Sequence, residues 1–140
     1  MYKHILIATD GSQFARKAVT QGLMLAKALG AKASAIMVTE PWAWEVREGP
    51  PAQDYESWAA AHAGELFASV HEAAKKISIA CSTTHRIGVP ADSILEFAKT
   101  SGCDLIVMAS HGRRGLSKVL LGSVTAEVVA RSSSPVLVCR

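Results

Sequence analysis

The sequence predicts an α/β fold: a doubly wound, five-stranded parallel sheet with helices on both faces. Apolar runs of strand length alternate along the chain with segments whose apolar residues recur at helical spacing. The run Leu105–Ala109 is apolar throughout and lies between Asp104 and Ser110, which is typical of a strand buried on both faces of a parallel sheet. The 140 residues are 49% hydrophobic and 19% charged, a composition that fits one globular domain over residues 1–140 and excludes a disordered chain.

The expected elements follow one another in a regular order. A strand at 2–9 precedes a helix at 13–29, for which Ser12 is a favourable N-cap and Gly30 a favourable C-terminal residue. The later elements are a strand at 33–39, a loop from 40 to about 51, a long helix from about 52 to 79, a strand at 81–87, a helix that begins near Pro90 and ends at Gly102, the strand at 105–109, a short helix at 123–131 and a last strand at 135–139. Ligands of such sheets bind at the carboxyl ends of the strands, so the loops after the strands are the places to search.

Composition and motifs exclude several classes of protein. No apolar run approaches the ~18 residues of a membrane span, and the first seven residues are too short for a signal peptide, so we expect a cytoplasmic protein. The formal charge of +3 is too small to indicate a nucleic acid or a membrane as partner. The three cysteines, Cys81, Cys103 and Cys139, form no CxxC motif, and we interpret them as small buried residues rather than as disulfide or metal ligands.

The stretch from Met108 to Thr125 carries the features of an anion-binding loop. Gly112 and Gly115 would let backbone amides approach a phosphate closely, and a helix beginning at Gly122–Ser123 would offer free N–H groups and a partial positive charge. Further donors and positive charges in or beside this loop are His111, Arg113, Arg114, Lys118, Ser123 and Thr125. On the residues alone a second interpretation stays open, in which Ser123 is only an N-cap and the glycines are only turn residues.

Several segments together resemble the universal stress protein family. They are Ile5–Ser12 (ILIATDGS), Gly88–Ala91 (GVPA), Asp104–Met108 (DLIVM), Ser110–Leu116 (SHGRRGL), Leu121–Ser123 (LGS) and Ser134–Val138 (SPVLV). ATP-binding members carry a pattern G-x-x-G-(nine residues)-G-[ST], onto which Gly112, Gly122 and Ser123 fall, with Ala109 in place of the first glycine. The resemblance implies the strand order 3-2-1-4-5 of adenine nucleotide alpha hydrolase-like proteins, and a site for ATP.

The same resemblance implies roles for individual residues. Asp10 would face the ribose or adenine, Ala8 and Val38 would line the adenine pocket, and Met108 would pack beside the sugar. The phosphates would be held through the backbone amides of Gly112, Gly122, Ser123 and Val124. At Ala109 a methyl group would stand where the backbone approaches the ribose. A carboxylate near phosphates needs a divalent ion between them, so Mg²⁺ is expected as a companion of ATP. The alternative role for Asp10 is that of an Asx-turn residue before the first helix.

These observations lead to one main hypothesis and one alternative. The main hypothesis is an ATP-binding regulatory protein of the stress response with little or no hydrolysis, because no nucleophile–base pair and no HxGH or SGGxDS motif occurs. It would act as a homodimer, since Val136–Cys139 is an apolar strand that the family places at the edge of the sheet and uses for dimerisation. The alternative is an interaction protein that binds no nucleotide, which Ala109 favours. Trp42 and Trp44 would pack on the long helix or cover the site as a lid.

Overall fold

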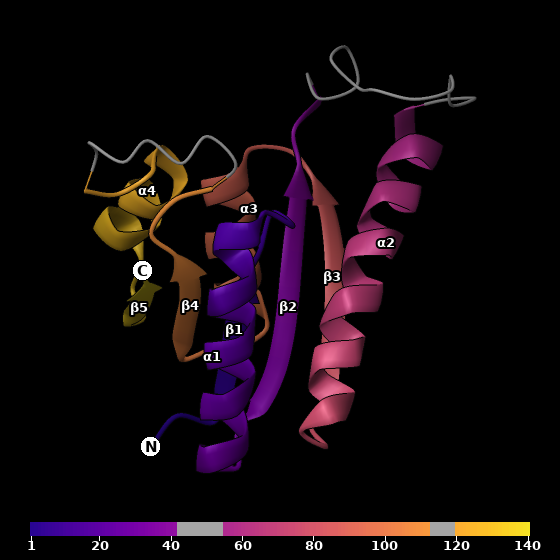
Figure 1. Ribbon diagram of the computed structural model, residues 1–140. Helices are drawn as coiled ribbons and strands as arrows, with labels where there is room; N and C mark the ends of the chain where they lie inside the picture. The colour runs from indigo at the N-terminus through magenta and orange to yellow at the C-terminus, as the bar shows by residue number, and fades with distance from the viewer. Residues whose placement is uncertain (42–54, 113–119) are drawn as a thin grey trace.

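The computed structural model describes residues 1–41, 55–112 and 120–140, and in these ranges it forms a five-stranded parallel sheet with helices on both faces (Figure 1). The elements are β1 (His4–Ala8), α1 (Gln13–Leu29), β2 (Lys32–Thr39), α2 (Tyr55–Lys76), β3 (Cys81–Ile87), α3 (Pro90–Thr100), β4 (Leu105–Ala109), α4 (Ser123–Arg131) and β5 (Val136–Cys139). The strands lie in the order β3-β2-β1-β4-β5, which confirms the expected fold and strand order. In the described ranges, no helix is both long enough and apolar enough to cross a membrane.

The ends of α1 agree with the sequence prediction. The Ser12 hydroxyl oxygen accepts a hydrogen bond from the Ala15 amide at 3.2 Å, so this serine caps the helix. Gly30 has a φ of 64°, a left-handed conformation that favours glycine, and its amide donates to the last carbonyls of the helix. Local residue chemistry therefore determines both ends of this helix.

The predicted end of the long helix was wrong. The helix was expected to run to Ile79, but α2 ends at Lys76 and Ser78 adopts a left-handed φ of 58°. Ile77 and Ile79 still pack against the core beyond the helix, and for this reason the apolar spacing continues after the helical backbone has ended. The predicted start at residues 52–54 lies outside the described residues.

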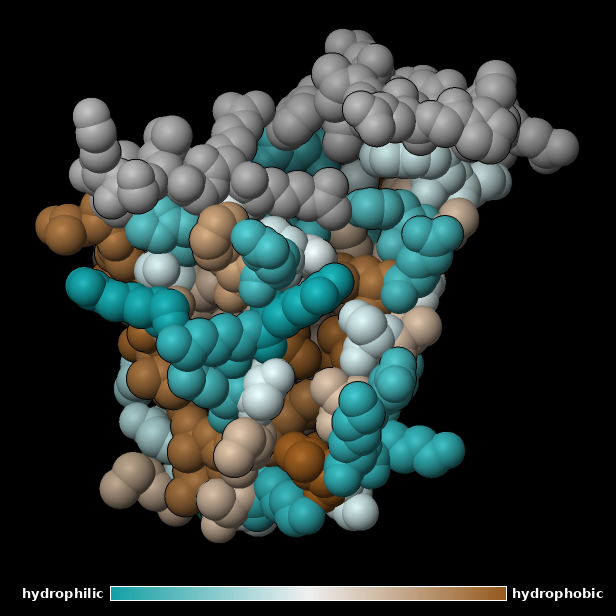
Figure 2. All heavy atoms as spheres, viewed as in Figure 1, coloured by the Kyte–Doolittle hydropathy of each residue, from teal (hydrophilic) through white to brown (hydrophobic). Residues whose placement is uncertain are grey.

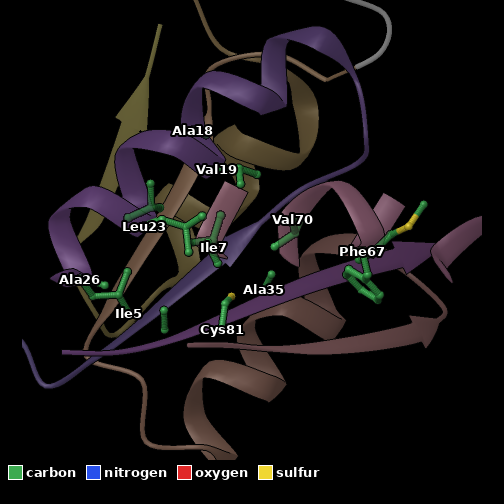
Figure 3. Packing of buried hydrophobic residues seen from close by; sticks show 14 of the residues in the cluster. Ile5, Ile7, Ala18, Val19, Leu23, Ala26, Ala35, Phe67, Val70 and Cys81 are labelled. Carbon is green, nitrogen blue, oxygen red and sulfur yellow. The ribbon is translucent and has the colours of Figure 1, made fainter. Parts of the chain in front are cut away.

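Two apolar layers enclose the sheet. One lies between the sheet and helices α1 and α2, where Ile5 and Ile7 of β1 meet Leu23 of α1 (Figure 3). The other lies between the sheet and helices α3 and α4, and includes Ile106 and Val128. Because side chains alternate along a strand, successive residues of each central strand enter opposite layers. This alternation decides which residues at the carboxyl ends can share a site.

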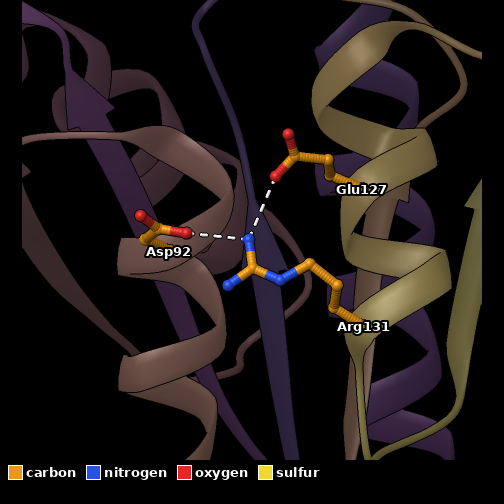
Figure 4. Close-up of polar contacts among 3 residues, drawn as sticks. All are labelled: Asp92, Glu127 and Arg131. Carbon is orange, nitrogen blue, oxygen red and sulfur yellow. Dashed lines mark hydrogen bonds and ion pairs between the residues drawn. The ribbon is translucent and has the colours of Figure 1, made fainter.

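Polar contacts join the start of β1 to the residue before β4, and α4 to α3. The Asp104 carboxylate accepts the backbone N–H groups of Lys3 and His4 at 2.8 and 3.0 Å, and these bonds lower the pKa of Asp104. Elsewhere, Arg131 of α4 lies 2.7 Å from Asp92 of α3 and 3.0 Å from Glu127 (Figure 4). All three of these side chains are about half exposed, so the cluster orients α4 beside α3 more than it stabilises the fold.

Candidate functional site

The three residues expected to surround an adenine lie on one face of the sheet. Ala8 ends β1, Val38 is near the end of β2, and Met108 is near the end of β4. Ala8 and Met108 are buried members of the layer below α3 and α4, and Val38 packs against that layer while remaining partly exposed. Because β2, β1 and β4 are neighbours in the sheet, these side chains lie near one another at its carboxyl end, and Val38 is the partly exposed member of the group.

Ala109 lies on the opposite face. Its side chain belongs to the layer below α1 and α2, together with Cys139, and the residue is 8% exposed. Its backbone is that of a β-strand, and in the described part of the chain the non-glycine residue with positive φ is Ser78. The methyl group therefore lies on the face of the sheet opposite the side chains of Ala8, Val38 and Met108. An alanine at this position needs no left-handed backbone of the kind that favours glycine.

Asp10 connects the loop after β1 with the loop after β4. One oxygen of its carboxylate, Oδ1, accepts a hydrogen bond from the Ser12 amide at 2.9 Å, which is the Asx turn that the alternative interpretation expected. The other oxygen, Oδ2, lies beside Gly112, since a Cβ atom built on that glycine would be 2.6 Å from it. The fold thus brings a carboxylate to the backbone of Gly112, in the loop that follows β4.

A backbone hydrogen bond joins the residues after β4 to the residue before α4. The Gly122 amide donates to the Ser110 carbonyl at 2.7 Å, and a Cβ atom on Gly122 would lie 3.3 Å from Cα of His111. Gly122 is the N-cap of α4 and Ser123 is its first residue, so the interpretation of Ser123 as the N-cap was wrong. Among the described residues, no side chain makes a capping hydrogen bond to this helix.

An uncapped helix start is suited to an anion. The first N–H groups of an α-helix, here those of Ser123 and Val124, have no carbonyl partner within the helix. They also mark the positive end of the helix dipole. The positive charges expected at Arg113, Arg114 and Lys118 lie outside the described residues, as do Gly115, Trp42 and Trp44.

The Thr125 hydroxyl and the His111 imidazole, both expected near phosphate, have hydrogen-bond partners within the chain. The Thr125 hydroxyl donates its proton to the Ala109 carbonyl at 2.8 Å, and the residue is 3% exposed. Nδ1 of His111 lies 3.1 Å from the Ser110 hydroxyl. Sequence reasoning missed Ser110 itself, whose amide donates to the Cys139 carbonyl at 2.8 Å and whose carbonyl receives the Gly122 amide. Its position directly after the most apolar strand was the available signal.

The site has one carboxylate and no preformed metal centre in the described ranges. No group of three or more histidine, cysteine, aspartate or glutamate side chains is placed there to hold an ion. Burial raises the pKa of Cys81 and of Cys103 to about 11, so both thiols are uncharged at neutral pH. These cysteines are buried, as expected, and lie at or before the starts of β3 and β4, away from the carboxyl end.

The structure defines an α/β protein in which a helix without a side-chain cap begins at the carboxyl end of a parallel sheet. The model of the universal stress protein family matches residues 1–140. The universal stress protein MJ0531 of Methanocaldococcus jannaschii is 34% identical over 146 residues, which cover 100% of this chain and 83% of that protein. The chain belongs to the universal stress protein family.

Solved structures of the family share the fold. The structure of MJ0577, also from Methanocaldococcus jannaschii, has a TM-score of 0.83 at 25% identity and covers 99% of this chain and 95% of that chain. A universal stress protein in complex with cAMP has a TM-score of 0.78 at 23% identity, covering 99% and 97% of the two chains. One from Archaeoglobus fulgidus in complex with dAMP has a TM-score of 0.72 at 19% identity, covering 99% and 98%. Two of these solved proteins, which share the fold, are thus bound to adenine nucleotides.

Proposed function

We propose that the protein binds an adenine nucleotide, ATP with Mg²⁺ in the first instance, and acts as a cytoplasmic regulatory protein of the stress response with little or no hydrolysis. The observation that carries the proposal is the uncapped start of α4, where the Gly122 amide donates to the Ser110 carbonyl at 2.7 Å. The universal stress proteins solved with cAMP and dAMP support an adenine nucleotide as the ligand.

Each part of the nucleotide has a matching part of the site. The phosphates would accept hydrogen bonds from the amides of Ser123 and Val124, at the positive end of α4. The glycines at 112 and 122 would let these oxygens approach the backbone. The adenine would pack at Ala8, Val38 and Met108, where its flat ring would cover the exposed part of Val38 above two buried apolar side chains.

Asp10 is the residue that would connect Mg²⁺ to the protein. Mg²⁺ is commonly held by one or two carboxylates together with phosphate oxygens and water, so a single aspartate beside a phosphate loop fits the ion. The Ser12 amide holds Oδ1 of Asp10, and Oδ2 lies beside Gly112, next to the loop that would carry the phosphates. The ion would screen the repulsion between this carboxylate and the phosphates.

The position of Ala109 bears on the alternative function, an interaction protein without nucleotide. That alternative depended on a methyl group obstructing the ribose. The side chain instead lies in the layer below α1 and α2, on the face away from Ala8 and Met108. We therefore propose that nucleotide binding survives this replacement of glycine.

The test is nucleotide binding by the purified protein. Small molecules released on denaturation are chromatographed, and Mg-ATP is titrated by calorimetry. We expect a micromolar Kd, which corresponds to about −8 kcal/mol. Gly122→Asp should abolish binding because it places a side chain and a negative charge at the helix start. Gly64→Asp is the matched control, since a Cβ atom on Gly64 meets no atom within 4 Å. A wild type that releases no nucleotide and gives no heat with Mg-ATP would support the interaction protein instead.

We also propose a homodimer that pairs the two copies of β5. The strand stands at the end of the sheet order beside β4, so its outer edge faces away from the sheet. Val136 and Val138 are partly buried and Leu137 is 39% exposed. In the space-filling view, hydrophobic side chains reach the surface along the margin on which β5 lies (Figure 2). An apolar strand edge of this kind favours pairing with a second chain.

Light scattering after size exclusion tests the dimer. The wild type should run as a dimer and Val138→Asp as a monomer, because the substitution places a charge in the paired edge. Val129→Asp is a control on α4, where the native side chain is 44% exposed outside the strand. A monomeric wild type would overturn this part of the proposal.

A further inference from the structure

Thr125 joins the first turn of α4 to the end of β4. It is the third residue of the helix and is 3% exposed, and its Oγ1 donates to the Ala109 carbonyl at 2.8 Å. We propose that Thr125 is a positioning residue: it fixes the start of α4 against the sheet so that the helix N–H groups are already aligned for phosphate. This inference rests on the proposed function, because it concerns the same phosphate site.

The direction of this hydrogen bond distinguishes it from an ordinary contact of threonine in a helix. A threonine within a helix can donate to a carbonyl three or four residues earlier in its own helix. Thr100 of α3 does so, with its Oγ1 2.9 Å from the Glu96 carbonyl. Thr125 has no complete helical turn before it, and its hydroxyl donates to the strand instead. The bond therefore fixes the helix relative to the sheet rather than one turn relative to the next.

The helix needs such an anchor because its cap is a glycine. A serine or aspartate cap would stabilise the helix start, but its side chain would accept from the N–H groups that a phosphate needs. With Gly122 as the cap, those groups stay available, and α4 has only nine residues with which to stabilise itself. A hydrogen bond from Thr125 to the sheet anchors the helix without using any N–H group of its first turn.

Two further contacts also fix the position of α4. The Gly122 amide donates to the Ser110 carbonyl at 2.7 Å, directly before the helix. At the other end of α4, Arg131 contacts Asp92 of α3 (Figure 4). The helix is thus held at both ends before any ligand binds. Groups that are ordered in advance lower the entropy cost of binding, so the anchor should contribute to affinity without contacting the ligand.

The hydrogen bond also excludes a direct role for Thr125 as a donor to phosphate in this arrangement. A hydroxyl group carries one proton, and that of Thr125 is directed at the Ala109 carbonyl. To donate to a phosphate, the side chain would have to leave a buried carbonyl oxygen without this partner, which is unfavourable.

Binding measurements on matched variants test the assignment. Thr125→Val keeps the shape of the side chain and removes the hydroxyl, Thr125→Ser restores the hydroxyl, and Thr100→Val is the control on α3. Mg-ATP and adenosine are titrated by calorimetry. We expect Thr125→Val to weaken Mg-ATP about tenfold, or about 1.4 kcal/mol, and to leave adenosine within about twofold. Thr125→Ser should restore Mg-ATP affinity, and Thr100→Val should change neither ligand. An equal loss of both ligands in Thr125→Val would indicate general destabilisation and would overturn the proposal.

Hydrogen exchange in the ligand-free protein separates positioning from direct contact. In Thr125→Val the hydrogen-bonded amides of Gly122 and Ala126, which donate to the Ser110 and Gly122 carbonyls, should exchange faster than in the wild type, while those of α3 stay unchanged. Unchanged exchange at the start of α4 would overturn the positioning role, whatever the affinity. If the wild type binds neither Mg-ATP nor adenosine, the proposed function fails. The exchange measurement then still decides whether Thr125 fixes the helix.

Discussion

Replacing Gly112 by alanine should disturb Asp10. The new Cβ atom would lie 2.6 Å from Oδ2 of Asp10, about 0.8 Å short of ordinary van der Waals contact. Because Oδ1 of the same carboxylate accepts from the Ser12 amide at 2.9 Å, a shift of the carboxylate away from the new methyl group would weaken or break this bond. Loss of a hydrogen bond to a charged group costs about 1.5–3 kcal/mol, so we expect Gly112→Ala to lower the free energy of unfolding by this amount.

A double-mutant cycle measures whether this contact is the cause. Urea unfolding is followed for the wild type, Gly112→Ala, Asp10→Ala and the double variant. In the Asp10→Ala background no carboxylate opposes the new methyl group, so Gly112→Ala should cost less than about 0.5 kcal/mol. Gly64→Ala is the control, since nothing lies within 4 Å of that position. Equal costs of Gly112→Ala in both backgrounds would show that Asp10 does not lie beside Gly112, which would refute the reasoning.

Three further predictions concern stability and reactivity. Gly22→Ala should lower the free energy of unfolding by about 1–2 kcal/mol in urea. The new Cβ atom would lie 2.6 Å from Cγ1 of Ile7, and this overpacking outweighs the gain in helix propensity. A stabilised variant would contradict the prediction. Asp104 has a lowered pKa in the folded protein, so its contribution is present above the unfolded pKa of about 3.9 and is lost as pH falls through the folded value. The stability difference between wild type and Asp104→Asn should therefore shrink below about pH 4, and a difference that grew on acidification would be inconsistent with this assignment. Cys81 and Cys103, with pKa values raised to about 11, should react at pH 8 about 100-fold more slowly with a thiol reagent in the folded than in the unfolded protein; equal rates would argue against their burial.

The sequence predicted the fold well where local chemistry and packing agree. The ends of α1 follow from Ser12 and Gly30, whose side-chain oxygen and backbone freedom act within a few residues. The strand Leu105–Ala109 was predicted with its observed bounds, because it is apolar throughout and flanked by polar residues. The end of α2 was not predictable in this way: Ile77 packs on the core from outside the helix, and the left-handed residue is a serine rather than a glycine.

The candidate site was predictable in its location more than in its contacts. The carboxyl ends of β1, β2 and β4 meet because of strand order, which the family resemblance supplied and the structure confirmed. The face of the sheet on which the Ala109 side chain lies depends on its exact position in the strand, because successive side chains point to opposite faces. The hydrogen bond from Thr125 to Ala109 joins residues 16 apart in sequence, and no local pattern indicates which carbonyl a buried hydroxyl will find.

The central claim is that the amides at the start of α4 bind the phosphates of an adenine nucleotide. The most direct measurement is a titration of the ¹⁵N-labelled protein with Mg-ATP, followed by NMR at each backbone amide. The account predicts saturable shifts that are largest at Ser123 and Val124, with smaller shifts at Asp10 and Val38. Saturation with the α4 amides unmoved, or no saturable shift anywhere, would contradict it.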